Sequence, residues 1–520
     1  MRTEALKKLE DEFDVLIIGG GATGVGIAVD SATRGYRTAL VEAGDFAQAT
    51  SSRATKLVHG GVRYLASGQI HLVYEALHER AVMLRNAPHL VHPLPFALPA
   101  YTWLDLPFYG IGLKIYDLLS GKSTMGPTKI LGPNETRQRL PNIAIKNLRG
   151  SILYHDGQFD DARLALALAR TAEDHGAVVL NYVRSKSLIK SDGKITGAVV
   201  QDVETGNQVT VRAKTVINAT GIFTDDLRHQ DDPSTPNLLS VSRGTHIVVA
   251  ASVLAGETAI MVPKTPDGRV IFAIPWSGRV VIGTTDLAAN KIEMEPGHQE
   301  SEIEFLMETI NPYLAKPVQR TDILSVFSGL RPLVTGKSST TSKLSREHHI
   351  DTSPAGLITV AGGKWTTYRR MAEDVLTFAI NHGMLPKQPC QTNTVRVHGA
   401  PATGIPTPGP LSRYGSDAAE IQRLQQSSSN LAADIDPSLP FTFAEVVFAV
   451  RNEMARTIED VLSRRMRALL IDARAAERAA PAVAKLMAAE LEAPPEWEQQ
   501  QIEVFQKLAS SFYLPQQASA

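Results

Sequence analysis

The chain has 520 residues, of which 43% are hydrophobic and 21% charged, and its formal net charge is -1. Such a composition is typical of soluble globular proteins and leaves room for two or three domains. The balanced charge argues against a nucleic-acid-binding protein, because no global field attracts phosphate. The single cysteine, Cys390, excludes an intramolecular disulfide and a cysteine-ligated iron–sulfur cluster within this chain.

The first residues give no sign of export or of a membrane span. Residues 1–14 carry charges throughout and contain no apolar core of a signal peptide. The nearest approach to a spanning segment is residues 87–104, but prolines recur through it and rule out an ordinary spanning helix. We therefore expect no export signal and no transmembrane helix.

The first predicted elements are a strand and a helix joined by a glycine turn. Gly19, Gly21 and Gly24 follow an apolar run at residues 15–18 and have the G-x-G-x-x-G spacing. Such a turn exposes backbone N–H groups and a helix N-terminus to a pyrophosphate. The next strand ends at Glu42, an acid that suits ribose hydroxyls and disfavours a 2′-phosphate. This unit predicts a dinucleotide, either NAD or FAD.

The larger part of the chain is predicted to be an interleaved α/β body. Strand patterns recur at residues 177–183, 215–221 and 356–363, and we expect these distant segments to share one sheet. Between them lie two insertions, at about residues 88–150 and 238–325, and the second is rich in alternating patterns. The insertions predict a second, antiparallel sheet.

Two further turns of small residues favour FAD over NAD. Ala219, Thr220 and Gly221 follow one strand, while Gly362 and Gly363 follow another and precede a helical pattern. The N-terminal N–H groups of that helix can face the pyrimidine edge of a flavin, where negative charge develops on reduction. A nicotinamide enzyme needs no such turn; the turn at Gly362 and Gly363 is called the closing turn below.

The pattern changes after residue 385. Residues 386–414 are rich in Pro, Gly and Thr and predict a linker, and residues 415–520 are mostly helical in pattern and predict a C-terminal helical domain. The preceding residues, 1–385, are predicted to form a FAD-binding and substrate domain. Its FAD parts are expected at about 1–87, 151–237 and 326–385, and its substrate parts at about 88–150 and 238–325.

Seven motifs carry a resemblance to a known family. They are "TSSRATKLVHGGVRYL" (residues 50–65), "DARLALA" (161–167), "GTHIVV" (244–249), "IGTTD" (282–286), "FSGLRPL" (327–333), "GGKWTTYR" (362–369) and "EMARTIEDVLSRR" (453–465). Through them the chain resembles the FAD-dependent glycerol-3-phosphate dehydrogenases, bacterial and mitochondrial, over nearly its whole length. No calcium-loop pattern follows the helical region, so the calcium control of the mitochondrial enzyme is not implied.

The resemblance implies an α/β fold with a FAD-binding Rossmann-like domain of the glutathione-reductase or D-amino-acid-oxidase type. An interleaved antiparallel-sheet substrate domain and a C-terminal helical domain complete it. The implied reaction is oxidation of sn-glycerol 3-phosphate to dihydroxyacetone phosphate by hydride transfer from C2 to FAD, with reoxidation by a membrane quinone. The implied location is the cytoplasmic face of the cell membrane, as a peripheral protein, or the cytoplasm. No nucleic acid is expected, and a homodimer is among the allowed states.

The candidate site residues come from the same motifs. Arg331 is the strongest candidate for the substrate phosphate, because burial of its charge without an anion would be costly. Histidine suits removal of the hydroxyl proton, with His246 first and His59 second; Arg331 and Lys364 can also stabilise the developing alkoxide, so the base stays open. The substrate set is Arg63, Tyr64, Arg331, Lys364 and Arg369. The cofactor set is Gly19, Gly21, Gly24, Glu42, Ser51, Ser52, Val183, Ala219, Thr220, Gly221, Gly363, Lys364, Thr366 and Thr367, and no metal site is predicted.

Three alternative functions stay open. A glycerol-3-phosphate oxidase would share the quoted motifs and pass electrons to oxygen, although 520 residues leave little room for the additional insertion expected of that branch. An amine or amino-acid oxidase of the same wider fold would need a carboxylate-binding site. A flavin-bearing RNA-binding protein would need a basic tract or catalytic cysteines, and the sequence has neither.

The electron acceptor is expected to dock from outside, because the chain has no second nucleotide fingerprint and no iron–sulfur ligands. Residues 101–122 interleave aromatic and aliphatic side chains with Lys114 and Lys122, and we expect this stretch to lie in the lipid headgroup layer. A basic cluster in the C-terminal helices is expected to add attraction to anionic lipid. Its members are Arg464, Arg465 and Arg467.

Overall fold

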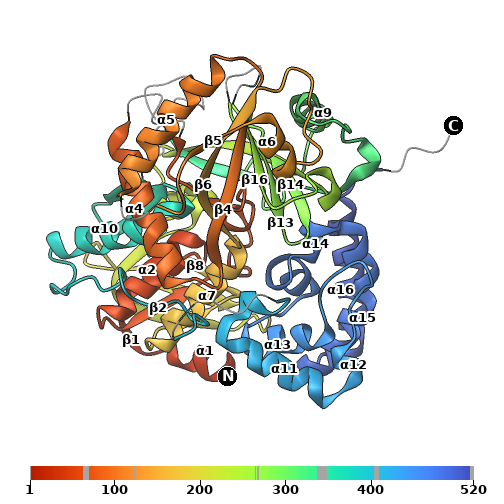
Figure 1. The fold of residues 1–520 in the computed structure, drawn as a ribbon. Helices are drawn as coiled ribbons and strands as arrows, with labels where there is room; N and C mark the ends of the chain where they lie inside the picture. The colour runs from red at the N-terminus through yellow and green to blue at the C-terminus, as the bar shows by residue number, and fades with distance from the viewer. Residues whose placement is uncertain are drawn as a thin grey trace.

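The computed structural model describes residues 2–62, 69–121, 124–263, 265, 269–335, 348–402, 404 and 409–515. These residues form two sheets, helices packed around them, and a group of C-terminal helices at one side of the molecule (Figure 1). The predicted α/β fold with a C-terminal helical domain is therefore confirmed.

The first sheet is built around β1 (Glu12–Ile18), a run of mostly buried apolar side chains. In the described residues it has eight strands in the order β17-β18-β10-β1-β2-β7, with the hairpin β8–β9 attached to β10. Strands β18, β10, β1, β2 and β7 run parallel, so their carboxyl ends meet at one edge. The other bounds are β2 (Thr38–Val41), β7 (Val178–Leu180), β8 (Val183–Ser191), β9 (Lys194–Asp202), β10 (Gln208–Asn218), β17 (His348–Thr352) and β18 (Leu357–Gly362).

Both faces of the first sheet are covered. The side chains of Val15 and Ile17 share a core with α2 (Ala22–Thr33), α7 (Asp161–Asp174) and α10 (Tyr368–Asn381). Leu16 and Ile18 point the other way, as alternation along a strand requires, and pack with the hairpin β8–β9. Two short helices complete this region, α1 (Arg2–Lys8) and α8 (Thr224–Asp231). Every residue of β1 after Glu12 is thus at least partly covered, which explains its continuous apolar run.

The second sheet has ten strands within the described residues, in the order β15-β11-β14-β13-β12-β4-β6-β3, with β16 on β11 and β5 on β6. All its pairs are antiparallel except β12 with β4. Its bounds are β3 (Leu57–Val58), β4 (Val91–Ala100), β5 (Lys129–Leu131), β6 (Gly150–Phe159), β11 (Leu239–Ala250), β12 (Ala259–Val262), β13 (Ile271–Trp276), β14 (Arg279–Gly283), β15 (Leu287–Ala289) and β16 (Ile323–Val334).

Three of these strands extend beyond the expected substrate parts. Strands β3, β6 and β16 lie wholly or mostly in segments expected to belong to the FAD region. Pairing between distant strands depends on tertiary contacts that a local pattern does not contain, so the sequence could not assign them. The helices near this sheet are α4 (Ile70–Asn86), α5 (Asp105–Ser120), α6 (Pro133–Arg139) and α9 (Glu300–Ile310).

The C-terminal helices pack against the second sheet. Phe327 of β16 and Trp276 of β13 share a core with Leu469, and the Ser325 hydroxyl donates to the Leu470 carbonyl at 2.5 Å. The helices are α11 (Ala418–Ser427), α12 (Ser429–Ala432), α13 (Phe443–Asn452), the π-helix η10 (Asp460–Arg465), α14 (Ala468–Ile471), α15 (Ala473–Leu491) and α16 (Pro495–Ser510). Figure 1 shows them in blue at the lower right of the view.

Candidate functional site

The glycine turn after β1 is tied by backbone bonds to the segment that follows β2. Gly19 N donates to Val41 O at 2.9 Å, and Gly20 N donates to a Glu42 carboxylate oxygen at 2.6 Å. A Cβ on Gly24 would lie 1.8 Å from Gly19 O, so only glycine permits this close approach of turn and helix. The other Glu42 oxygen accepts from Gly44 N at 2.8 Å. Burial raises the pKa of Glu42, while these N–H bonds oppose the shift.

A hollow of about 120 Å³ lies beside this turn. Among the predicted residues it is lined by Gly21, Ser51, Ala219, Gly221, Gly363 and Lys364. It shares Thr50, Pro332 and residues 362–365 with a second hollow of about 230 Å³, so the two adjoin along the closing turn. A long cofactor with a phosphate-bearing middle fits these adjoining hollows, because the N-terminus of α2 and the glycine turn lie at one end.

Several other predicted cofactor residues engage the backbone around the hollows. The Ser51 hydroxyl accepts from Ala22 N at 2.9 Å, at the first turn of α2. The Thr220 hydroxyl donates to Asn218 at 2.7 Å, and the Thr367 hydroxyl donates to Lys364 O at 3.2 Å. Val183 is buried, and its N–H donates to Glu42 O at 2.7 Å. These contacts shape the walls rather than point side-chain groups into the cavity.

Ser52 differs from Ser51. It is fully buried, and its hydroxyl donates to Ala49 O at 3.5 Å. It lines neither of the two adjoining hollows. Thr366, by contrast, is buried and lines the larger hollow. We therefore keep Thr366 and leave Ser52 out of the proposed cofactor site.

Strands β11 and β16 bring His246 and Arg331 to one face of the second sheet. Ser242 pairs with Arg331, Gly244 with Gly329, and His246 with Phe327. Because side chains alternate along a strand, these register positions share one face. A Cβ on Gly244 would lie 2.2 Å from an Arg331 guanidinium nitrogen, so the glycine lets that side chain lie across the strand.

His246 has the environment of a neutral imidazole. Its ring is 2% exposed and stacks on Phe327 with a centroid separation of 4.7 Å. Nε2 lies 3.0 Å from the Thr55 hydroxyl, and Nδ1 has no hydrogen-bond partner in the described part of the chain. Burial and the charges of Lys56 and Arg331 hold the pKa of His246 well below its usual range. In the tautomer in which Nε2–H donates to Thr55, Nδ1 carries the lone pair that can accept a proton.

Arg331 and Lys364 supply cations at the larger hollow, which His246 and His59 also line. The Arg331 guanidinium donates to the Thr284 hydroxyl at 3.0 Å and to Thr285 O at 3.1 Å, and it lies 3.3 Å from Asp286. Its side chain keeps 26% of its surface exposed. Arg331 is therefore oriented by Thr284, Thr285 and Asp286 at the wall of the larger hollow, where a guanidinium can meet an anion.

Arg369 is engaged elsewhere. Its guanidinium makes a two-point contact with Glu79 at 2.6 and 2.8 Å and a further contact with Glu373 at 2.9 Å. It is 4% exposed and lines none of the hollows around the closing turn. Arg369 thus fastens α10 to α4, and we do not place it among the proposed substrate-binding residues. Arg63 and Tyr64 lie outside the described residues.

The site contains groups that the sequence interpretation missed. Lys56 is fully buried, and its amine donates to Asp161 at 2.7 Å and to Ser52 O at 2.9 Å. Burial lowers the pKa of Lys56 to about 7, although Asp161 opposes the shift. A Cβ on Gly283 would lie 2.3 Å from the His246 ring, so this glycine makes room for the ring. The quoted motifs contain all of these residues, but only the folded arrangement shows their contacts.

An aromatic hollow of about 190 Å³ adjoins the larger hollow and shares Thr55, Leu57, His59 and Arg331 with it. The rest of its lining combines the apolar and aromatic residues Val62, Phe96, Tyr154, Met261, Val270 and Phe272 with the polar and charged residues Asp156, Arg269, Thr284, Thr285 and Asp286. Phe96 stacks on Tyr154 and meets Phe272 edge to face, which gives the hollow a rigid aromatic wall. An aromatic wall beside polar and charged groups suits an organic ring that carries polar substituents.

Helix α5 and its approach carry a stripe of exposed apolar side chains, at the outer edge of the molecule (Figure 1). The stripe consists of Trp103, Leu104, Phe108, Ile111, Ile115 and Leu118. From Leu104 onward the spacing alternates four and three, so these side chains share one helix face. Lys114 is exposed beside it, and Lys122 lies outside the described residues. In the described part of the chain, no helix is both long and apolar enough to cross a bilayer.

The expected lipid-binding role of the C-terminal arginine cluster is wrong. Arg464, Arg465 and Arg467 are all 0% exposed. The first two pair with Asp45 and the third with Asp161. Guanidinium groups that are buried against carboxylates present no charge to a membrane surface.

Comparisons with known proteins agree with the arrangement of hollows and sheets. The family model described as FAD dependent oxidoreductase matches residues 14–369, and that of the C-terminal domain of alpha-glycerophosphate oxidase matches residues 409–502. The fold and the glycine-turn hollows therefore define a FAD-dependent oxidoreductase, and the predicted cofactor FAD is confirmed.

Individual relatives narrow this class of oxidoreductases to one family. The mitochondrial glycerol-3-phosphate dehydrogenase of Macaca fascicularis is 40% identical over 95% of this chain and 73% of its own length. That of Arabidopsis thaliana is 40% identical over 92% of this chain and 83% of its own. The solved glycerol-3-phosphate dehydrogenase from Bacillus halodurans, complexed with FAD, has a TM-score of 0.78 at 28% identity and covers 100% of this chain and 99% of its own. The chain belongs to the FAD-dependent glycerol-3-phosphate dehydrogenase family, as its motifs predicted.

Proposed function

We propose that this protein oxidises sn-glycerol 3-phosphate to dihydroxyacetone phosphate and passes the electrons to a membrane quinone. The observation that carries the proposal is the meeting of His246, Arg331 and Lys364 at one hollow beside the closing turn. A base and two cations are the groups that oxidation of a phosphorylated alcohol requires.

The chemistry divides between the cofactor and the chain. Bound FAD supplies the acceptor for the hydride that leaves C2 of the substrate. His246 takes the hydroxyl proton, because burial keeps its imidazole neutral and so able to accept. Arg331 binds the phosphate from the wall of the larger hollow, where Thr284 and Asp286 orient its guanidinium. Lys364 assists at the phosphate or at the developing alkoxide, and His59 remains the second candidate for the base.

The cofactor is proposed to lie along the two adjoining hollows. Glu42 would receive the ribose hydroxyls, and the turn with Gly19, Gly21 and Gly24 would face the pyrophosphate. The closing turn at Gly363 would lie near the flavin. Arg63 and Tyr64 remain predicted substrate-binding residues from the motif "HGGVRYL".

The aromatic hollow supports a quinone as the acceptor. It adjoins the proposed flavin site, and its wall of Phe96, Tyr154 and Phe272 suits a planar ring. Oxygen is small and needs no ring-sized site, so the aromatic wall is the feature that favours a quinone. The alternative, a glycerol-3-phosphate oxidase, shares the remaining features.

Helix α5 supports attachment to the membrane surface. Its apolar stripe is exposed in the described chain, and Lys114 adds a positive charge beside it. An amphipathic helix of this kind lies in the plane of the interface, with its apolar face in the boundary between headgroups and acyl chains. The proposed location is therefore peripheral, where a membrane quinone is within reach.

The experiment compares acceptors on vesicles. Holoenzyme that is reduced anaerobically by glycerol 3-phosphate is mixed either with vesicles containing a quinone or with air-saturated buffer. Faster reoxidation by the quinone, with little hydrogen peroxide, supports the dehydrogenase. Stoichiometric peroxide at the full turnover rate in air, with no response to quinone vesicles, identifies the oxidase instead.

A further inference from the structure

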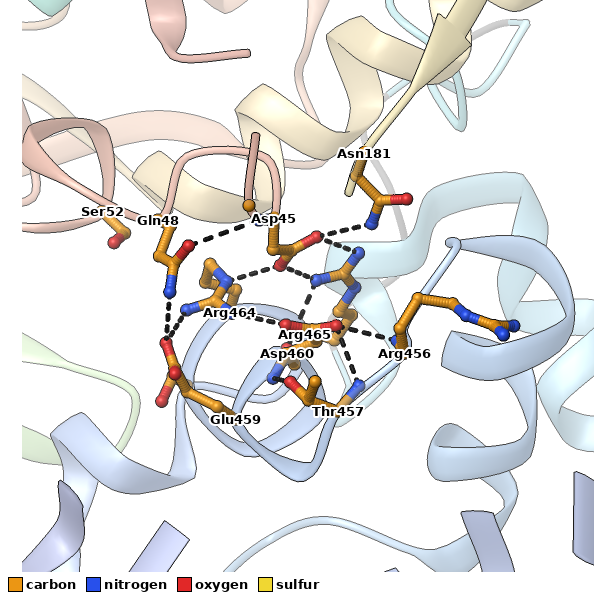
Figure 2. A network of polar contacts seen from close by, with 12 residues as sticks. Asp45, Gln48, Ser52, Asn181, Arg456, Thr457, Glu459, Asp460, Arg464 and Arg465 are labelled. Atoms are coloured by element: carbon orange, nitrogen blue, oxygen red, sulfur yellow. Dashed lines mark hydrogen bonds and ion pairs between the residues drawn. The ribbon is translucent and has the colours of Figure 1, made fainter. Parts of the chain in front are cut away.

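A buried ion network joins the segment after Glu42 to the C-terminal helical domain (Figure 2). Asp45 lies in that segment, and Arg464 and Arg465 end the π-helix η10. All three side chains are 0% exposed. The two domains are therefore tied by charges that have no access to water.

Asp45 is the centre of the network. Arg464 Nε donates to one of its oxygens at 2.5 Å, Arg465 Nη1 donates to that same oxygen, and Arg465 Nη2 donates to the other at 2.9 Å. Asn181 donates to that second oxygen at 3.0 Å. Burial alone would raise the pKa of Asp45, but the charges of Arg465 and Arg464 outweigh it and hold that pKa below its usual value.

A second carboxylate completes the network on the side of η10. Asp460 accepts from Arg464 at 2.6 Å, from the Tyr182 hydroxyl at 2.7 Å and from Arg456 N at 2.7 Å. Glu459 pairs with Arg464 and lies 3.4 Å from Gln48 Nε2, at a partly exposed edge. Figure 2 shows the two arginines between these carboxylates, with Gln48 on the FAD side.

The segment that carries Asp45 is also part of the proposed cofactor site. Gly44 N and Gly20 N both donate to the Glu42 carboxylate, at 2.8 and 2.6 Å. Ala47 N donates to Gly20 O at 3.1 Å, within the glycine turn itself. A displacement of residues 44–48 would therefore move both Glu42 and the turn.

Stability by itself does not account for this arrangement. Replacement of a buried ion pair by well-packed apolar side chains is often neutral or stabilising, so buried charges are weak grounds for a purely stabilising role. Two guanidinium forks on one carboxylate do, however, fix the position of that carboxylate in direction as well as distance. Here the carboxylate stands between Gly44 and Ala47, the two residues that hold Glu42 and Gly20.

We propose that Arg464 and Arg465 are positioning residues for FAD. Through Asp45 they hold residues 44–48 in the conformation that places Glu42 and the glycine turn, so that the C-terminal helical domain takes part in cofactor binding. The proposal rests on the assignment of Glu42 to the FAD ribose under the proposed function.

The test measures the Kd of apoprotein for FAD by flavin fluorescence. Arg465→Met should weaken binding by about tenfold, within the range of about 5–150-fold typical of coupled sites, and Arg465→Lys should restore part of it. The control is Arg413→Met, which breaks another ion pair of the C-terminal region, that with Glu445, away from residues 44–48 and η10. At saturating FAD, KM for glycerol 3-phosphate should not change in Arg465→Met.

Coupling of this kind is reciprocal, which gives a second readout independent of activity. FAD should slow hydrogen exchange of the amides of η10 in the wild-type protein, and by a smaller factor in Arg465→Met. Structural damage alone would raise exchange in apoprotein and holoprotein alike.

The outcomes separate this proposal from the assignment of the site. FAD affinity in Arg465→Met no weaker than in Arg413→Met overturns it. If Arg465→Met does not fold, Glu459→Gln at the partly exposed edge replaces it, and unchanged affinity there overturns the proposal in the same way. Glu42→Gln is the reference: normal FAD binding in that variant contradicts the proposed ribose site itself, and the positioning role fails with it.

Discussion

Arg331 and the pair Arg464 and Arg465 look alike in sequence, but different residues surround them. Arg331 is held by two threonines and one carboxylate and keeps 26% of its side chain exposed at a hollow. Arg464 and Arg465 have no exposed surface and face Asp45 from two directions. A guanidinium at the wall of a hollow can meet a ligand, whereas one with no exposed surface is committed to its protein partners.

The same difference applies to the surroundings of each group. Around Arg331, Gly244 leaves room for the guanidinium itself, and its pairing partner Gly329 leaves room for the Arg53 side chain. Around Arg464, Asp460 and Glu459 fill the space with acceptors. We propose that the first region receives an anion, whereas the second already contains its anions.

The largest expected effect lies in the region around Arg331, at His246. His246→Asn should lower kcat/KM for glycerol 3-phosphate by about 100- to 10,000-fold, the usual contribution of a positioned base. Because the pKa of His246 is well below its usual range, wild-type kcat/KM should stay level through neutral pH and fall only in more acidic solution. The variant should lose that acidic limb, which a pH profile of kcat/KM measures.

Loss of one member of the ion network around Arg464 should instead reduce the stability of the fold. Arg464→Met leaves Asp45 and Asp460 with less charge to balance them and should lower the free energy of unfolding by about 3–5 kcal/mol. Arg331→Met, whose side chain is partly exposed, should cost far less. Denaturant unfolding of the two holoproteins gives the comparison, and equal losses would contradict the distinction between the regions.

Arg331→Met should in turn affect catalysis. We expect kcat/KM for glycerol 3-phosphate to fall by the equivalent of about 2–4 kcal/mol, the scale for loss of one partner of a desolvated charge pair. The FAD content should persist, because Arg331 lies on the substrate side of the hollow. Steady-state kinetics and the flavin absorbance of the same preparation check both statements.

The smallest effect, a change in membrane binding, is expected at α5, where the apolar side chains are exposed. Phe108→Ser should weaken binding to anionic vesicles by about tenfold, since burial of such a side chain contributes about 1.5–3 kcal/mol. The matched control is Val504→Ser, because Val504 is also an exposed apolar side chain, on α16. Phe378 would not serve as a control, because its ring stacks on His382. Equal losses for both variants would remove the case for α5.

The sequence allowed much of the fold and the cofactor to be predicted, for a physical reason. The glycine turn and the apolar run of β1 are local patterns, and the backbone geometry they impose is the same in any context. The family motifs identified His246 and Arg331 as candidates. The structure supplied the register of β11 and β16 that brings them to one face.

The distant partners of the buried charges could not be predicted from such local patterns. Arg369 and Arg464 stand in basic, polar stretches that resemble exposed ones, and only the folded chain places Glu79 and Asp45 against them. Lys56 likewise gives no local signal that its amine meets Asp161. Burial of a charge depends on a partner that is distant in sequence, so pattern and spacing cannot predict it.

One measurement tests the central claim most directly, namely that Arg331 recognises the phosphate at the larger hollow. It is the rate of anaerobic flavin reduction by glycerol 3-phosphate and by free glycerol, in the wild-type holoprotein and in Arg331→Met. We predict rapid bleaching of the wild type by glycerol 3-phosphate, very slow bleaching by glycerol, and a much smaller difference between the two substrates in the variant. Equal rates with both substrates in the wild type, or an undiminished preference in Arg331→Met, would contradict the account.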